Sequence, residues 1–162
     1  MVDLNLRPYE SEDQPGIISL IDGVLKEYGQ SVDLARADAD LLGITEAYDA
    51  RGGAFIVLED HTGHVCGTHA TLPLDQETGL LTFRRLYLAP EYRGCGQGGK
   101  LMSWALNWGR ANGFHQVHFW SDTLFTRAHA FFTACGFEKT GEVRTKHDSH
   151  DPYQEFGFSK IL

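Results

Sequence analysis

Paired cysteines, a basic excess and long apolar runs are all missing from this chain of 162 residues. Its three cysteines, Cys66, Cys95 and Cys135, are widely spaced, so neither a disulfide framework nor a zinc knuckle is indicated. Lys and Arg number 14 against 22 Asp and Glu, which gives a formal charge of −8, and no polybasic run is present. Such a chain has no overall electrostatic attraction for nucleic acid.

The apolar runs are too short to cross a membrane. The longest, such as Ala54–Leu58, are far below the roughly 20 residues that span a bilayer. Asp3 and Glu10 lie where a signal peptide would need an apolar core. We therefore expect a cytoplasmic protein with neither nucleic acid nor a membrane as a partner. The length and the 42% hydrophobic content predict that residues 1–162 form a single domain.

Hydrophobic periodicity predicts an α+β chain. Strands are predicted over residues 4–8, 54–58, 64–72, 80–88, 114–120, 137–143 and 153–158. Helices are predicted from an N-cap at Asp13 to about Gly29, over 98–112 and over 123–134, with loosely patterned helical turns within 33–50. The central strand–helix–strand unit requires one parallel crossover in an otherwise antiparallel sheet.

The most informative stretch is a glycine-rich turn between the strand 80–88 and the helix 98–112. It reads Arg93-Gly94-Cys95-Gly96-Gln97-Gly98-Gly99-Lys100. Glycines let the backbone close around an anion, and successive N–H groups at a helix N-terminus favour phosphate. The turn is therefore predicted to bind phosphate groups, although glycine-rich turns also occur without a ligand.

One interpretation of this turn is a P-loop. The pattern Gly94-x-x-x-x-Gly99-Lys100 matches the first seven P-loop positions, which would indicate a magnesium-dependent nucleotide-binding protein. Leu101, however, stands where a Ser or Thr hydroxyl must ligate the metal. The turn also follows an antiparallel meander rather than an early parallel strand.

The second interpretation is a resemblance to a family. Arg93-x-x-Gly96-x-Gly98, after the strand end Leu86-Tyr87-Leu88-Ala89-Pro90, resembles the acyl-CoA pyrophosphate loop of the GNAT superfamily of N-acetyltransferases. Residues 128–137 resemble the late helix of that family with its terminal Gly-Phe, and the order of elements matches along nearly the whole chain. The resemblance implies a GNAT-like fold, with a central, mostly antiparallel sheet of about six to seven strands, a splayed parallel pair and flanking helices.

The same resemblance implies acetyl-CoA or coenzyme A as the cosubstrate and no metal. The pantetheine arm would lie between the splayed strands, here 80–88 and 114–120. Main-chain groups of Leu86, Tyr87 and Leu88 are implied to pair with it, and the Leu88 N–H to face the oxyanion that develops on the thioester. Further cofactor contacts are implied for Arg93, Gly94, Cys95, Gly96, Gln97, Gly98, Gly99, Lys100, Phe125 and Phe132.

Three positions depart from the common family pattern. Phe132 replaces a Tyr that protonates the departing thiolate in many members, Thr82 replaces a Glu that serves as the base, and Phe125 replaces an Asn that contacts the CoA arm. Water or a nearby side chain, Ser121, Asp122 or His129, is therefore expected to relay protons, and Ser121 and His129 are the candidate catalytic side chains. The alternative is structural: His129 as a partly buried helix residue and Ser121 as part of an N-cap.

The resemblance implies direct transfer of the acetyl group to a primary amine of a small molecule or a protein, with both substrates bound together. The net charge of −8 mildly favours a cationic acceptor. The acceptor pocket is expected to involve Glu27 and Tyr28 with the following loop, and Thr82 and Arg84. Adjacent on one strand, Arg84 and Arg85 are expected to face opposite sides.

Two further expectations complete the sequence-based account. Family members are often homodimers, so a homodimer is expected here. Because Phe132 and Thr82 replace the usual acid and base, the alternative function is an acyl-CoA-binding regulatory module without turnover.

Overall fold

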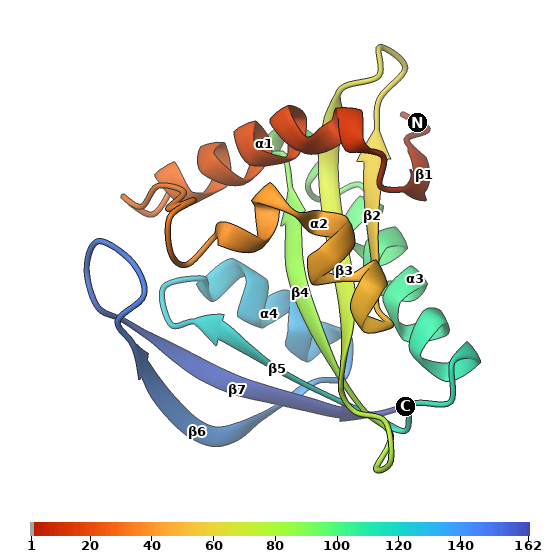
Figure 1. Ribbon diagram of the computed structural model, residues 1–162, viewed down its shortest axis with the longest axis vertical. Helices are drawn as coiled ribbons and strands as arrows, with labels where there is room; N and C mark the ends of the chain where they lie inside the picture. Colours follow the sequence, from red (N-terminus) through yellow and green to blue (C-terminus); the bar gives the residue numbers. More distant parts are fainter. Residues whose placement is uncertain (1) are drawn as a thin grey trace.

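A seven-stranded sheet forms the centre of the protein, with the strand order β1-β2-β3-β4-β5-β7-β6 (Figure 1). The computed structural model describes residues 2–162. The strands are β1 (Asn5–Pro8), β2 (Ala54–Glu59), β3 (Val65–Asp75), β4 (Leu80–Leu88), β5 (Gln116–Asp122), β6 (Glu138–Lys146) and β7 (Tyr153–Ile161). The α-helices are α1 (Gln14–Lys26), α2 (Ile44–Ala47), α3 (Gln97–Ala111) and α4 (Thr126–Ala134). The predicted mixture of an antiparallel sheet with one parallel pair and flanking helices is confirmed.

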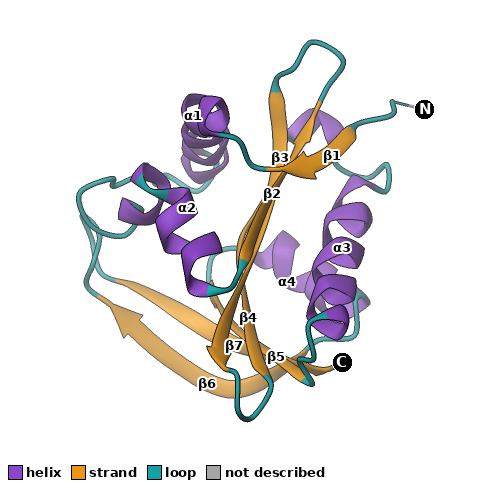
Figure 2. Cartoon of the chain, turned by 45° about the vertical axis from the view of Figure 1, so that its right-hand side comes forward, coloured by secondary structure: helices purple, strands orange, loops and turns teal. Residues whose placement is uncertain are grey.

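Helices cover both faces of the sheet: α1 and α2 lie on one side and α3 on the other (Figure 2). The alternation of β2 explains this arrangement, since successive side chains of a strand point to opposite faces. Phe55 and Val57 pack with Ile21 and the rest of the α1–α2 core. Ile56, between them, packs with Leu101 of α3. Among residues 2–162, no helix combines the length and apolarity needed to cross a membrane.

The parallel pair β4–β5 is joined only at its beginning. Leu80 pairs with Gln116 and Leu81 with Val117, and no further pairs follow between these strands in residues 2–162. On its other edge, β5 pairs with β7 along its whole length. Figure 1 shows β4 and β5 diverging after their two paired residues. The splay implied by the family resemblance is therefore present.

A bulge in β4 corrects the expected orientation of the two arginines. Thr68 pairs with Tyr87 and Ala70 with Arg84, which leaves one extra residue on β4. Arg85, in the bulge, has a φ of +58° and is the one non-glycine residue of the described chain in the left-handed region. The bulge turns Arg85 toward the α1–α2 side. That is also the side of Arg84, so the expectation of opposite faces is wrong.

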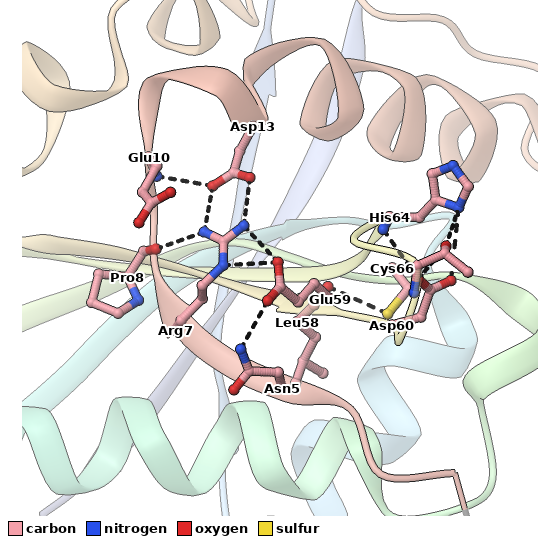
Figure 3. A network of polar contacts seen from close by, with 11 residues as sticks. Asn5, Arg7, Pro8, Glu10, Asp13, Leu58, Glu59, Asp60, His64 and Cys66 are labelled. Atoms are coloured by element: carbon pink, nitrogen blue, oxygen red, sulfur yellow. Dashed lines mark hydrogen bonds and ion pairs between the residues drawn. The ribbon is translucent and has the colours of Figure 1, made fainter.

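Asp13 occupies the N-cap position of α1 but makes no capping hydrogen bond with its side chain. Its carboxylate instead accepts two hydrogen bonds from the Arg7 guanidinium, both of 2.8 Å, and one from the Glu10 N–H (Figure 3). Arg7 also donates to Glu59 at 2.8 Å. Arg7, bonded to both Asp13 and Glu59, therefore fastens β1 and β2 to the start of α1. Asp13 lies at the predicted N-cap position, but its side chain does not cap the helix.

The boundaries of the later elements differ from the prediction by a few residues. The helix predicted over 123–134 begins at Thr126, because Asp122 Oδ1 accepts the Leu124 N–H and forms a turn first. The strand β3 continues through Pro73, where the pairing with β4 is irregular. Proline is tolerated at such irregular positions because its missing N–H breaks no regular ladder.

Candidate active site

A cleft of about 1040 Å³ opens where β4 and β5 separate. It is walled by the two strands, the loop after α1, the start and one face of α4, and the segment between β6 and β7. The cleft brings together the predicted site residues Thr82, Arg84, Leu86, Tyr87, Ser121, Phe125 and Phe132. The size suits a drug-sized or larger ligand.

The backbone of β4 offers an unpaired edge toward the departing β5. The Ala89 N–H donates to the Cys66 carbonyl at 2.8 Å, on the β3 side. Successive N–H groups of a strand point in opposite directions, so the Leu88 N–H points toward the β5 side. Because β5 has already turned away there, the edge is open to an extended ligand. Leu88 lies one residue beyond Tyr87, which lines the cleft.

The glycine-rich loop has the shape of an anion site. Gly94 and Gly96 have φ values of +76° and +88°, which side-chain-bearing residues rarely adopt. Gly96 is the N-cap of α3 and supplies no side-chain cap. The first helical hydrogen bond runs from the Lys100 N–H to the Gly96 carbonyl at 3.1 Å. The N–H groups of Gln97, Gly98 and Gly99 therefore have no partner within the helix.

The same loop is open on its outer side. A Cβ built on Gly94, Gly96 or Gly99 would meet no other heavy atom of residues 2–162 within 4 Å. Backbone approach by a ligand is thus unobstructed at three of the four glycines. An open row of N–H groups at a helix N-terminus fits a pyrophosphate.

The polar side chains of the loop are directed to protein groups instead of solvent. Arg93 donates to Glu27 at 2.8 and 2.7 Å and to the Leu88 carbonyl at 3.0 Å. Lys100 donates to the Leu4 carbonyl, and Gln97 to the Val2 carbonyl at 3.1 Å. The capacity of the loop for anions therefore lies in its backbone amides. Cys95 is another predicted contact of this loop, and its thiol donates to the Tyr92 carbonyl at 3.0 Å.

Glu27 and Tyr28, expected in the acceptor pocket, do not line the cleft. The hydrogen bond from Arg93 lowers the pKa of Glu27, although partial burial acts in the opposite direction. The Tyr28 ring packs against Phe125 with centroids 4.8 Å apart. The next residues, Gly29 to Ser31, do line the cleft. This wall of the cleft thus begins a few residues later in the chain than Glu27 and Tyr28.

Ser121 and His129 lie next to one another. Ser121 Oγ and His129 Nε2 are 3.2 Å apart, and their residues are 8% and 7% exposed. Burial, aided by the positive charge of Lys139, lowers the pKa of His129, so its imidazole is neutral at pH 7. Ser121 lines the cleft, and His129 lies behind it. The pair can carry a proton between the cleft and a neutral imidazole.

The contacts of Asp122 and Phe132 are structural. The Asp122 carboxylate accepts hydrogen bonds of 2.9 Å from the Gln30 side chain and from the Leu124 N–H, so it joins the loop after α1 to the end of β5. The Phe132 ring is buried against the rings of Phe119 and Phe158. Phe132 therefore shapes the apolar wall and supplies no proton.

Sequence reasoning missed a buried ion cluster beside the cleft. Arg85 donates to Asp38 at 2.7 Å and forms a further ion pair with Asp40, which also accepts a 2.6 Å hydrogen bond from Tyr48. Burial acts to raise the pKa of Asp40, but the charge and hydrogen bonds of Arg85 outweigh it and leave the pKa lowered. The partners are 45 or more residues apart, and no spacing rule indicates such a pair.

The segment between β6 and β7 was also missed as part of the site. Residues 149–155 line the cleft, and the Tyr153 hydroxyl donates to Asp148 at 2.8 Å. A polar loop in sequence carries no sign that it folds back over a distant strand. Within residues 2–162, no group of three or more His, Cys, Asp or Glu side chains is arranged to hold a metal ion.

Comparisons with known proteins agree with this geometry. The model of the acetyltransferase (GNAT) family matches residues 20–137. YjgM, an uncharacterized N-acetyltransferase of Escherichia coli K12, is 29% identical over 136 residues, which are 82% of this chain and 81% of that protein. An acetyltransferase from Streptococcus agalactiae has a TM-score of 0.84 at 22% identity and is covered over 98% of each chain. A GNAT superfamily phosphinothricin acetyltransferase from Sinorhizobium meliloti, in complex with acetyl-CoA, has a TM-score of 0.77 at 21% identity, over 98% of this chain and 88% of that one.

Proposed function

The chain belongs to the acetyltransferase (GNAT) family, and on this premise we propose that it binds acetyl-CoA where β4 and β5 separate and transfers the acetyl group directly to a primary amine. The acceptor is a small molecule or a protein. Membership of this family replaces the interpretation of Gly94–Lys100 as a P-loop. One observation carries the proposal: β4 and β5 pair only at Leu80 and Leu81 and then enclose a cleft of about 1040 Å³.

In this proposal the pantetheine arm lies along the open edge of β4 as an additional strand. The main-chain groups of Leu86, Tyr87 and Leu88 pair with it, and the open glycine loop binds the pyrophosphate through the N–H groups of residues 94–99. The Leu88 N–H faces the thioester oxygen, where negative charge develops as the amine attacks. The relative from Sinorhizobium meliloti, solved with acetyl-CoA, supports this choice of cosubstrate.

The amine approaches from the α1–α2 side of the cleft. Its lone pair forms the new C–N bond, the C–S bond breaks, and one proton leaves the nitrogen. Ser121 passes that proton to the neutral His129 ring, 3.2 Å away, and the CoA thiolate departs. No covalent enzyme intermediate is involved, because binding both substrates together supplies the proximity that the reaction needs.

A second candidate function is an acyl-CoA-binding regulatory module without turnover. Phe132 and Thr82 favour it, since neither side chain can act as the acid or base at its position. The two candidates differ in one measurable quantity, which is the amine-dependent release of free thiol.

The experiment is a thiol-release assay with acetyl-CoA and a broad panel of primary amines, with buffer alone as the blank. The proposal predicts release above the blank with at least one amine, together with a mass increase of one acetyl group on that amine. Saturable binding of acetyl-CoA without release from any amine would overturn the transferase proposal and favour the regulatory module. The homodimer and the cytoplasmic location stay predictions, to be tested by size-exclusion chromatography and cell fractionation.

A further inference from the structure

The carboxylates and the arginines that line the cleft differ in how far they are partnered within the protein. Three of its carboxylates already have partners. Asp38 is paired with Arg85 at 2.7 Å, Glu155 with Arg144 at 2.6 Å, and Asp122 accepts two hydrogen bonds. These three carboxylates thus accept hydrogen bonds from other groups of the protein. Asp151 of the β6–β7 loop remains as the exposed carboxylate of the lining.

One guanidinium in the same wall lacks such a partner. Arg84 is exposed and lines the cleft, and no carboxylate or hydrogen-bond acceptor of residues 2–162 lies within bonding distance of it. Arg51, from the 3-10 turn before β2, is likewise exposed and lines the cleft. The lining thus holds two exposed guanidinium groups without a carboxylate partner, although its four arginines and four carboxylates balance in number.

The bulge of β4 explains why Arg84 has no carboxylate partner. Phe83 packs in the core on the α3–α4 side, so Arg84, its neighbour, projects toward α1 and α2. The bulge brings Arg85 to that same side, where it takes both Asp38 and Asp40. Arg84 is then a second cation beside a cluster of one arginine and two aspartates, and it forms no ion pair of its own with either carboxylate. A residue held at a φ of +58° in a cleft is typical of sites where strain serves function.

We propose that the acceptor is an amine that also carries a carboxylate, as a free amino acid does, and that Arg84 binds this carboxylate. The inference rests on the proposed transferase function. A planar guanidinium matches a carboxylate with two parallel hydrogen bonds and so fixes its orientation. With the carboxylate at Arg84, two positions along β4 from Leu86, the amine of a small molecule can point to the strand edge that would hold the thioester. A polyamine would offer no anionic group to this guanidinium.

The test compares amino acids with their own α-carboxamides as acceptors, in the thiol-release assay. Each pair differs only in the carboxylate, so the ratio of kcat/KM within a pair measures its recognition. The variants are R84Q, which removes the charge, R84K, which keeps it without the fork, and R110Q as a matched control. Arg110 is exposed on α3 and does not line the cleft. Acetyl-CoA binding of each variant is measured by thermal melting.

The wild type is expected to favour at least one acid over its amide by about tenfold or more, because a charge-assisted bond of this kind is strong. R84Q should lose that preference through a higher KM for the acid, R84K should regain part of it, and R110Q should behave as wild type. Equal use of acids and amides, or a preference unchanged in R84Q, would overturn the inference while leaving the transferase function intact. If acetyl-CoA binds but none of the amines causes release of free thiol, both the inference and the transferase function are overturned.

Discussion

Arg93 and Glu27 form a two-point ion pair, with N–O distances of 2.8 and 2.7 Å, that joins the end of α1 to the glycine-rich loop. The two residues are 66 positions apart, and Arg93 also donates to the Leu88 carbonyl. One side chain therefore contacts the loop's own strand and the helix on the acceptor side. Both charges are partly exposed, which limits the energy of the pair.

The first prediction concerns the stability that this pair contributes. A double-mutant cycle with E27Q and R93Q should give a coupling energy of about 1 kcal/mol at pH 7, because two charge-assisted hydrogen bonds are partly screened by water. Arg93 lowers the pKa of Glu27 in the folded state. The contribution is thus present above the unfolded pKa and is lost as the pH falls through the folded pKa. Urea unfolding at a series of pH values from 7 downward measures both; a coupling that does not decline as the pH falls would contradict the ion pair.

A second prediction concerns the buried cluster around Arg85. D40N removes one charge next to a guanidinium that is nearly enclosed, so it should lower the free energy of unfolding by about 3 kcal/mol or more. D151N, at an exposed carboxylate, should change it by about 0.5 kcal/mol or less. Both are measured by urea unfolding. Similar losses in the two variants would show that the cluster does not support the fold.

A third prediction separates binding from stability at the glycine loop. G99A adds a methyl group to the first turn of α3, where no atom of the described residues lies within 4 Å, so stability should stay equal or rise by up to about 1 kcal/mol. Acetyl-CoA affinity should fall by about tenfold, since the added Cβ faces the proposed pyrophosphate. G23A, in the open face of α1, is the control and should raise stability without changing affinity. Unchanged affinity in G99A would remove the pyrophosphate from this position.

Much of the fold could be predicted from the sequence because the helices and strands have local sequence signals. The helix around Met102 and Ala105 follows from apolar spacing, and the end of α3 follows from Gly113, which has a φ of +81°. The splay of β4 from β5 followed from the family resemblance alone, since the run Leu80–Leu88 carries no local sign of where pairing stops.

The parts that could not be predicted depend on contacts between distant residues. Arg85 reads as an ordinary strand residue until the bulge opposite His69 reverses its direction. The bulge has no glycine to signal it. In the same way, Asp13 has the residue type and the position of a cap, but Arg7 of the preceding strand competes for its carboxylate. In both cases the local pattern is outweighed by contacts with residues elsewhere in the chain.

A fourth prediction uses the buried histidine opposite the bulge. His69 is fully buried, and its Nδ1 lies 3.1 Å from the Leu101 carbonyl, whereas Nε2 has no partner within the described residues. Burial lowers the pKa of His69 to about 4. The unfolded chain, with a pKa of about 6.5, binds more protons between these values, so stability should fall as the pH drops from about 6.5 to 4.

The size of this effect is about 3 kcal/mol, from about 1.4 kcal/mol for each pH unit of difference. Urea unfolding at several pH values measures it, and the H69Q variant should show a flatter dependence over the same window. H64Q, at an exposed histidine, is the control and should keep the slope of the wild type. An unaltered slope in H69Q would assign the acid sensitivity to other groups.

A fifth prediction addresses the proposed relay. S121A and H129Q should each lower kcat by about 10- to 100-fold with little change in the KM for acetyl-CoA, because a proton step is lost while the binding edge is kept. In the wild type, kcat should fall as the pH drops through the lowered pKa of His129. S103A, on the exposed face of α3, is the control. A kcat that S121A leaves unaltered would assign proton transfer to solvent.

The central claim, that the splay and the glycine loop bind acetyl-CoA, is tested most directly by thermal melting with acetyl-CoA, coenzyme A and Mg-ATP in parallel. A ligand at 100 times its Kd adds about 2.7 kcal/mol, which for a chain of this size raises Tm by on the order of 5–10 °C. The account predicts such a rise with acetyl-CoA and coenzyme A and none with Mg-ATP. A rise with Mg-ATP alone, or no rise with either CoA species, would contradict it.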